Sequence, residues 1–150
     1  MYTQAELSRI RSDFWTRFGQ YMSPVPSAGG GSVNWVNYKT GIKHIRFTMD
    51  FTKRSAEVCV EISITETDKR KLIWSTFSSL WQQSFPEAEW IHYEDTVVDN
   101  KLMSALKITA DSVSIFRQET WPEAISFLKQ RMLLLDAFWA ENKEMFEMMI

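Results

Sequence analysis

The sequence has a single cysteine, Cys59, among its 150 residues, so no disulfide can form within the chain. A chain of this length buries roughly 70% of its unfolded surface and needs neither a disulfide nor a structural metal to fold. Its two histidines, His44 and His92, lie far apart, and no second cysteine is present to complete a zinc site. We therefore expect no cofactor, and the low cysteine content favours a reducing cytoplasm.

Long apolar runs are absent as well. None approaches the ~20 residues that a membrane-spanning helix needs. The N-terminal stretch MYTQAELSRIRSDFW lacks the apolar region of a secretory signal. The net charge of -2 is not typical of a protein that coats nucleic acid non-specifically, although a local basic patch remains compatible with it. We expect a cytoplasmic protein that does not associate with membranes.

Three segments have the pattern of helices. TQAE, residues 3–6, is a capping box, and the apolar residues after it recur at helical spacing up to the prolines that follow. A second helix is predicted over residues 67–84, with Pro86 ending it. TWPE, residues 120–123, is a second capping box, and it opens a C-terminal helix of roughly 25 residues, about 40 Å long.

The segment SPVPSAGGGSVNWVNYKTG, residues 23–41, has three consecutive glycines. It lacks the Lys-Ser or Lys-Thr of a phosphate-binding P-loop and does not join a strand to a helix. We interpret its glycine-rich part as a flexible connection and VNWVNY, residues 33–38, as a strand. Trp35 and Tyr38 then lie either at an edge of the core or on a binding face.

The clearest strands are residues 43–50 and 56–64, where apolar and polar residues alternate on either side of the loop TKRS. A four-residue loop pairs Asp50 with Glu57. The same register then pairs Thr48 with Cys59, Arg46 with Glu61 and His44 with Ser63, and it keeps the apolar sides on one face.

Further strands are predicted over residues 88–94, 101–109 and 112–116, with a loop at 96–100. KLMSALK, residues 101–107, is also compatible with a short helix. The expected fold class is therefore α/β (α+β): a single domain, residues 1–150, with a mixed sheet. The expected order is helix, three strands, helix, strands and a long C-terminal helix.

No residue pattern gives a complete catalytic set. Asp50, Glu57 and Glu61 share a sheet face with Arg46, and acids paired across strands can bind Mg²⁺. The simpler interpretation is an ion pair between Arg46 and Glu61. Cys59 is either a nucleophile beside His44 or a small buried side chain, and we favour the second.

The predicted order of helix, three strands, helix and strand resembles the core of the restriction-endonuclease-like fold. In that fold an Asp on the second strand and a Glu-x-Lys or Asp-x-Lys on the third carry the metal chemistry. Asp50 matches the first acid. Glu57-Val58-Cys59 and Glu61-Ile62-Ser63 both lack the lysine.

Three longer segments resemble the bacterial domain-of-unknown-function family 4268. They are FWTRFGQYMSPVPSA, NWVNYKTGIKHIRFTMD and WPEAISFLKQRMLLLDAFW, and the resemblance covers nearly the whole chain. In that family small proteins stand alone, and the domain also occurs at the C-terminus of larger proteins, some with nuclease-like parts. The resemblance implies a single α/β domain and no established activity, so it assigns no catalytic residue.

Our first hypothesis is a non-catalytic domain that binds a macromolecular partner, with the C-terminal helix as a surface for self-association or for a protein. The second is nucleic-acid binding, in which bases stack on aromatic rings while cations meet phosphates. Its residues are Trp35, Tyr38, Lys39, Lys43, Arg46, Lys53 and Arg54. The third is a divergent metal-dependent nuclease that uses Asp50, Glu57 and Glu61.

Overall fold

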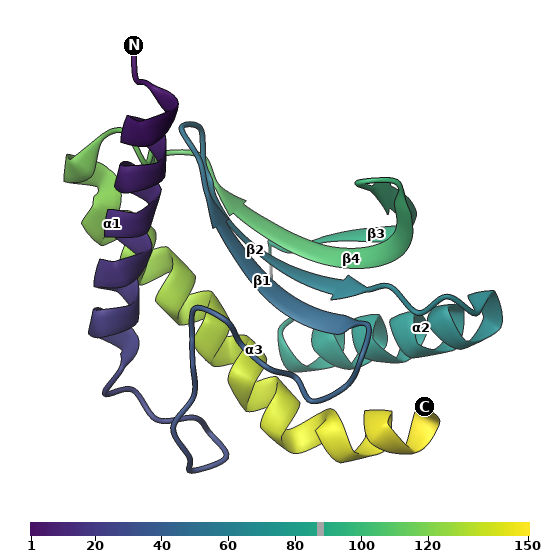
Figure 1. The fold of residues 1–150 in the computed structure, drawn as a ribbon. Helices are drawn as coiled ribbons and strands as arrows, with labels where there is room; N and C mark the ends of the chain where they lie inside the picture. Colours follow the sequence, from purple (N-terminus) through teal and green to yellow (C-terminus); the bar gives the residue numbers. More distant parts are fainter. Residues whose placement is uncertain (87–88) are drawn as a thin grey trace.

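A computed structural model of the protein describes residues 1–86 and 89–150, whose fold is drawn in Figure 1. The helices are α1 (Gln4–Met22), α2 (Thr67–Ser84) and α3 (Trp121–Met149), and a short 3₁₀ turn, η1 (Gln118–Thr120), precedes α3. The strands are β1 (Ile45–Phe51), β2 (Ala56–Ile62), β3 (Ile91–Val98) and β4 (Lys101–Ala110). The expected α+β class is confirmed.

The four strands form one sheet in the order β1-β2-β4-β3, and every neighbouring pair is antiparallel rather than mixed. Alternation fixed the register of the first hairpin correctly. Asp50 lies opposite Glu57, Thr48 opposite Cys59 and Arg46 opposite Glu61. The expected pair His44–Ser63 lies just beyond the ladder, where the Ser63 amide donates to the His44 carbonyl at 2.9 Å.

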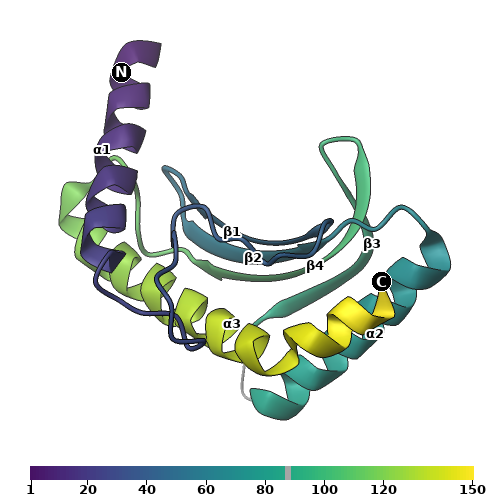
Figure 2. The same ribbon diagram turned by 60° about the horizontal axis from the view of Figure 1, so that its bottom comes forward.

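Helices α2 and α3 cover the convex face of this curved sheet, and α1 stands beside the sheet against α3 (Figures 1 and 2). Large rings fill the space between the layers. Phe77 of α2 lies within ring-contact distance of Phe47 on β1 and of Phe138 and Phe146 on α3. The high aromatic content of the sequence therefore mostly forms the core.

Two expected strands are wrong. Residues 33–38 form an irregular loop: Asn37, which in a strand would share a face with the buried Trp35, is exposed, and its amide donates to the Asn34 side chain at 3.1 Å. Residues 112–116 are also irregular, although the side chains of Val113 and Ile115 are buried in the core. The resulting order is helix, two strands, helix, two strands, helix.

The third strand also differs from its expected limits. Of the range 88–94, residue 88 lies outside the described residues, and β3 begins at Ile91. Residues 96–98, expected in a loop, continue β3 to Val98 through a shift of register between Tyr93 and Thr96. Strand β4 matches its prediction to within a residue.

The first capping box is confirmed, since Thr3 and Glu6 each bond to the other's backbone amide. The second is not formed. The Thr120 side chain instead meets Ser114, whose amide donates to its hydroxyl at 3.0 Å. Helix α3 has 29 residues, close to the expected length. Within the described ranges no helix is long and apolar enough to cross a membrane.

Candidate functional site

One face of the sheet carries no helix, and we call it the open face (Figure 2). The register places alternate side chains of all four strands on it. Its residues are Arg46, Thr48 and Asp50 of β1, Glu57, Cys59 and Glu61 of β2, Lys101, Met103, Ala105, Lys107 and Thr109 of β4, and Ile91, Tyr93, Thr96 and Val98 of β3. The open face therefore contains all three acids that the sequence suggested, together with Arg46.

The open face is hollowed at its centre. A cavity of about 210 Å³ is lined by ten of these residues. Cys59, Met103 and Ala105 form its floor and are only 7%, 5% and 3% exposed although no helix covers them. They are buried because the sheet curls, which brings the β3–β4 hairpin up beside them (Figures 1 and 2).

Ion pairs engage two of the three acids. Arg46 lies 3.6 Å from Glu61, as the simpler interpretation predicts, and Lys107 lies 3.5 Å from Glu57. Among the described residues no group of three or more His, Cys, Asp or Glu side chains is placed to share a metal ion. The nuclease interpretation stays a prediction, and the geometry brings no support to it.

Asp50 lies directly opposite Glu57 across the two strands. Its carboxylate accepts a hydrogen bond from the Phe51 amide, and no cation within the described ranges forms an ion pair with it. Like charges directly opposite one another destabilise a sheet. This end of the open face therefore holds an uncompensated negative charge.

Cys59 does not have the setting of a nucleophile. Its burial, with the Glu61 carboxylate as the next cause, raises the pKa of the thiol to about 12. His44 is not its neighbour. Cys59 pairs with Thr48, and Thr48 is four residues further along the chain than His44, a distance of roughly 13 Å in a strand. The interpretation of Cys59 as a small buried side chain fits this geometry.

Trp35 and Tyr38 do not form an exposed stacking surface. Trp35 is 2% exposed, and its ring N–H donates to the Val25 carbonyl at 2.9 Å. The Tyr38 ring stacks on Phe47 with a centroid distance of 5.4 Å. Of the two alternatives, core edge or binding face, both rings belong to the core edge.

Asp136 of α3 holds the glycine-rich segment, a role that no local pattern of residues indicates. This carboxylate is 2% exposed. It accepts hydrogen bonds from the Ser27 hydroxyl at 2.9 Å, the Ala28 amide at 2.6 Å and the Tyr38 hydroxyl at 2.7 Å. Burial, followed by the hydrogen bond to Asp136, raises the pKa of Tyr38 above its ordinary value. The expected flexible connection is thus bonded to a helix more than a hundred residues away.

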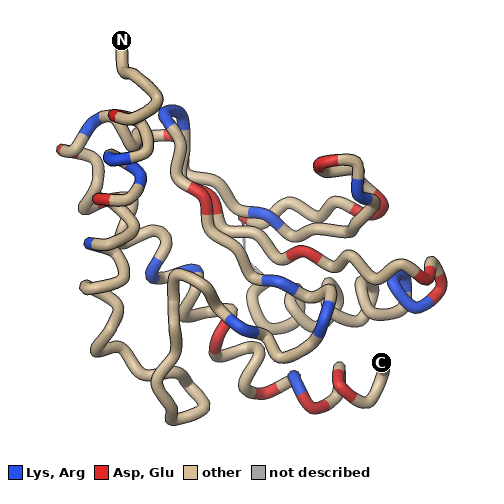
Figure 3. Tube along the Cα trace, viewed as in Figure 1, with Lys and Arg blue, Asp and Glu red and all other residues tan. Residues whose placement is uncertain are grey.

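The basic residues fall into two separate groups. Lys39, Lys43 and Arg46 lie where β1 begins, whereas Lys53 and Arg54 form the turn at its other end. Strand β1 has seven residues, so about 20 Å separates the groups. Figure 3 shows the blue segments at opposite ends of the β1–β2 hairpin.

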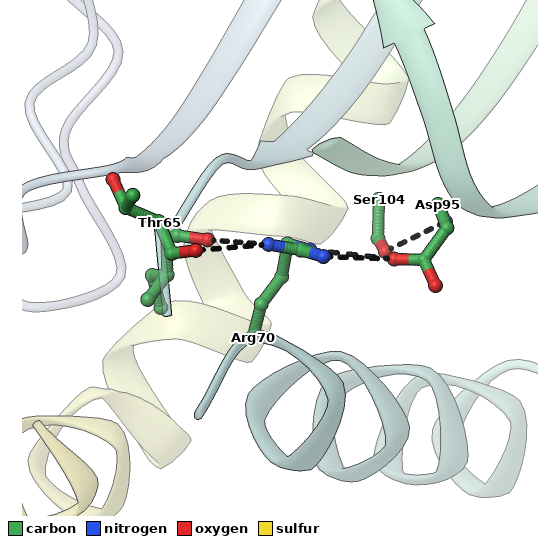
Figure 4. Close-up of polar contacts among 5 residues, drawn as sticks. Thr65, Arg70, Asp95 and Ser104 are labelled. Carbon is green, nitrogen blue, oxygen red and sulfur yellow. Dashed lines mark hydrogen bonds and ion pairs between the residues drawn. The ribbon is translucent and has the colours of Figure 1, made fainter. Parts of the chain in front are cut away.

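A buried cation supports the far wall of the open face. Arg70 of α2 is 2% exposed. Its guanidinium donates to the Ile64 carbonyl at 2.9 Å and, on its other side, to the Asp95 carboxylate at 3.2 Å (Figure 4). The sequence does not predict this role, because Arg70 belongs to the polar run DKRK, residues 68–71, and nothing local marks one of its cations as buried.

A family model described as "Domain of unknown function (DUF4268)" matches residues 10–143. No curated protein and no solved structure matches the chain.

Proposed function

The chain belongs to the DUF4268 family, a domain of unknown function, and we therefore propose its role from the geometry of its own residues: it is a non-catalytic interaction domain. The open face is its binding surface. The partner is an amphipathic helix of another protein that lays its apolar side on this face and places a basic side chain beside Asp50 and Glu57.

The observation that carries the proposal is the apolar character of a sheet face without a helix. A solvated face of an antiparallel sheet is ordinarily polar. Here Ile91 is 56% exposed, and Tyr93 and Val98 are each 38% exposed, beside the apolar floor of Cys59, Met103 and Ala105. Clustered apolar surface rimmed by polar groups is typical of a protein interaction site.

The shape of this surface favours a helix over an extended segment. A helix with its side chains is about 10–12 Å wide, which suits a concave face four strands across. An extended segment would instead add to an edge of the sheet, which is β1 or β3. The irregular edge is that of β3. There Glu94 and Asp95 are exposed and Asp95 has a φ of 52°, and charge and irregularity of this kind oppose strand addition.

Charge identifies the chemistry of the partner. Asp50 and Glu57 oppose each other at one end of the open face, and Lys107 is the cation that lies near Glu57. A lysine or arginine of the partner beside Asp50 would relieve the repulsion. Complementary charge of this kind fixes the orientation of a partner and speeds its association.

A photo-crosslinking residue tests this. It is placed at Thr96 on the open face and, as the matched control, at exposed Ser79 on α2, and each protein is irradiated in a lysate of the source organism. We expect Thr96, and not Ser79, to capture a peptide segment. Mass spectrometry should show that segment to have apolar residues at helical spacing and at least one Lys or Arg.

Asp50→Lys tests whether the negative charge at this end of the open face contributes to binding. Glu141→Lys, on the exposed side of α3, is the control for the same reversal of charge away from the open face. We expect only Asp50→Lys to reduce capture at Thr96. Equal capture from both positions, a segment without helical periodicity, or capture that Asp50→Lys leaves unchanged would refute the proposal.

A further inference from the structure

We propose that residues 39–46, which we call the basic loop, form with Lys143 of α3 a binding site for the phosphate groups of a nucleic-acid backbone. This site lies where β1 begins. It is separate from the floor of the open face, and it does not depend on the proposed helix partner.

The basic loop lines two adjoining hollows. One, of about 330 Å³, is lined entirely by residues 37–46 and includes Lys39, Lys43 and Arg46. The other, of about 270 Å³, includes Lys39 and Lys143. The two share Tyr38 and Lys39, so four cations line a continuous surface. Successive phosphates of a strand would meet successive cations on it.

The backbone is shaped to admit Lys143. Gly41 has a φ of +83°, a conformation that suits glycine, and a Cβ at this position would lie 2.5 Å from the Lys143 ammonium nitrogen. The absence of a side chain at Gly41 thus lets a cation from the C-terminal helix reach the basic loop, although the two residues are about a hundred positions apart in the sequence.

Few carboxylates compete for these cations. Among the described residues that line the two hollows, Asp136 is the acid, and it is already bonded to Ser27, Ala28 and Tyr38. Glu61 pairs with Arg46 at 3.6 Å, but the Arg46 side chain is 70% exposed and remains open to a ligand. Lys39, Lys43 and Lys143 form no ion pair within the described ranges.

The mode of binding follows from what the surface lacks. Trp35 is buried and the Tyr38 hydroxyl is held by Asp136, so neither ring is free to stack on bases. Contacts to phosphates alone carry no base sequence and weaken as salt screens them. We therefore expect binding that is sensitive to salt and indifferent to sequence.

The test is fluorescence anisotropy with a labelled 20-nucleotide single strand of mixed sequence, from 50 to 200 mM salt. The variant Lys39→Ala/Lys43→Ala removes two cations of the basic loop. The matched control is Lys53→Ala/Arg54→Ala, which removes two exposed cations at the other end of the same hairpin and leaves the chain with an equal charge.

We expect the wild-type protein and the control to bind with similar affinity. The double variant in the basic loop should bind about tenfold more weakly at 50 mM salt, and its slope of log K against log salt should be smaller by about 1.4, since each phosphate contact to a single strand contributes about 0.7. Lys143→Ala should reduce the slope by about 0.7. Circular dichroism establishes that every variant is folded.

A second experiment adds inorganic phosphate at a constant ionic strength. It tells whether the site binds the phosphates of a nucleic-acid strand or free phosphate. Displacement of the strand only by a large excess of phosphate supports the proposal. The proposal would be overturned if the wild-type protein did not bind the strand, or if it bound inorganic phosphate but not the strand. It would also be overturned if the Lys53/Arg54 control lost as much affinity as the variant in the basic loop.

Discussion

The guanidinium of Arg70, on α2, lies 3.2 Å from the carboxylate of Asp95, on β3. Asp95 sits at the irregularity of β3 with a φ of 52°, and its amide meets the Ser104 hydroxyl of β4 at 3.2 Å. This one cation therefore joins the start of α2 to the hairpin that walls the open face. The contact joins residues 25 positions apart in the sequence and ties the hairpin that walls the open face to α2.

Replacing Asp95 tests this contact. Asp95→Ala leaves the Arg70 guanidinium, whose side chain is 3% exposed, without its counter-ion. Removing one partner of a buried pair is strongly destabilising, and because Asp95 is partly exposed we expect a cost at the lower end, about 3 kcal/mol in the free energy of unfolding. Urea denaturation measures it. Asp111→Ala, at an exposed acid, is the control and should cost under about 0.5 kcal/mol. Equal costs for the two variants would contradict this role for Arg70.

The reactivity of Cys59 tests its burial. With its pKa raised to about 12, the thiol is almost entirely protonated at pH 8 in the folded protein. The unfolded thiol has a pKa near 8.5, so the thiolate fraction should rise roughly a thousandfold on unfolding. Labelling with a disulfide reagent at pH 8, with and without urea, follows this difference. Rapid labelling of the folded protein would instead restore Cys59 as a candidate nucleophile.

Tyr38→Phe should make the alkaline pH dependence of stability shallower. The folded pKa of Tyr38 is raised, so above about pH 10 the unfolded chain loses a proton that the folded chain keeps, and stability falls as pH rises. At pH 10.5 this loss is somewhat less than about 0.8 kcal/mol, since the ring is only partly buried and solvent screens part of the effect.

At neutral pH the same substitution removes a hydrogen bond to a carboxylate and should cost about 1.5–2 kcal/mol. The difference between the wild-type protein and Tyr38→Phe should therefore narrow between pH 7.5 and 10.5 in urea denaturation experiments. A difference that stays constant over this range would show that Tyr38 ionises as readily in the folded chain as in the unfolded one.

Local patterns predicted the parts of the fold that local rules govern. The hairpin register followed from alternation in Ile45–Phe51 and Ala56–Ile62, because a shift of one residue would turn every apolar side chain to solvent. The bounds of α2 followed from a polar first turn and from Pro86. In the first capping box Thr3 and Glu6 bond to each other's backbone amides, as the spacing predicts. At the second box, with the same spacing, the Thr120 hydroxyl bonds to Ser114 from outside the helix instead.

The errors share a different cause. Residues 33–38 have the composition of a strand, but Tyr38 is held by Asp136, about a hundred residues away, and this contact fixes a loop instead. The apolar floor of the open face was also hidden. In β4 both Ala105 and Leu106 are apolar and buried, so alternation there could not tell the covered face from the open one.

Alanine substitutions at two glycines distinguish an effect on Lys143 from an effect of backbone strain. Gly30 and Gly41 have φ values of +93° and +83°, so alanine at either position is strained and should cost about 1 kcal/mol in the free energy of unfolding. A Cβ at Gly30 has no heavy atom within 4 Å, whereas a Cβ at Gly41 displaces the flexible end of Lys143. The two variants should therefore lose similar stability in urea denaturation.

Their binding of the single strand should differ. Gly41→Ala pushes one cation out of the basic loop, so we expect its affinity in the anisotropy assay to fall and its salt slope to decrease by about 0.7, as in Lys143→Ala. Gly30→Ala should bind like the wild-type protein. If both glycine variants lost affinity equally, the effect would come from strain in the segment and not from Lys143. If neither lost any, strand binding would not depend on Lys143, because Gly41 is the position that admits its side chain to the basic loop.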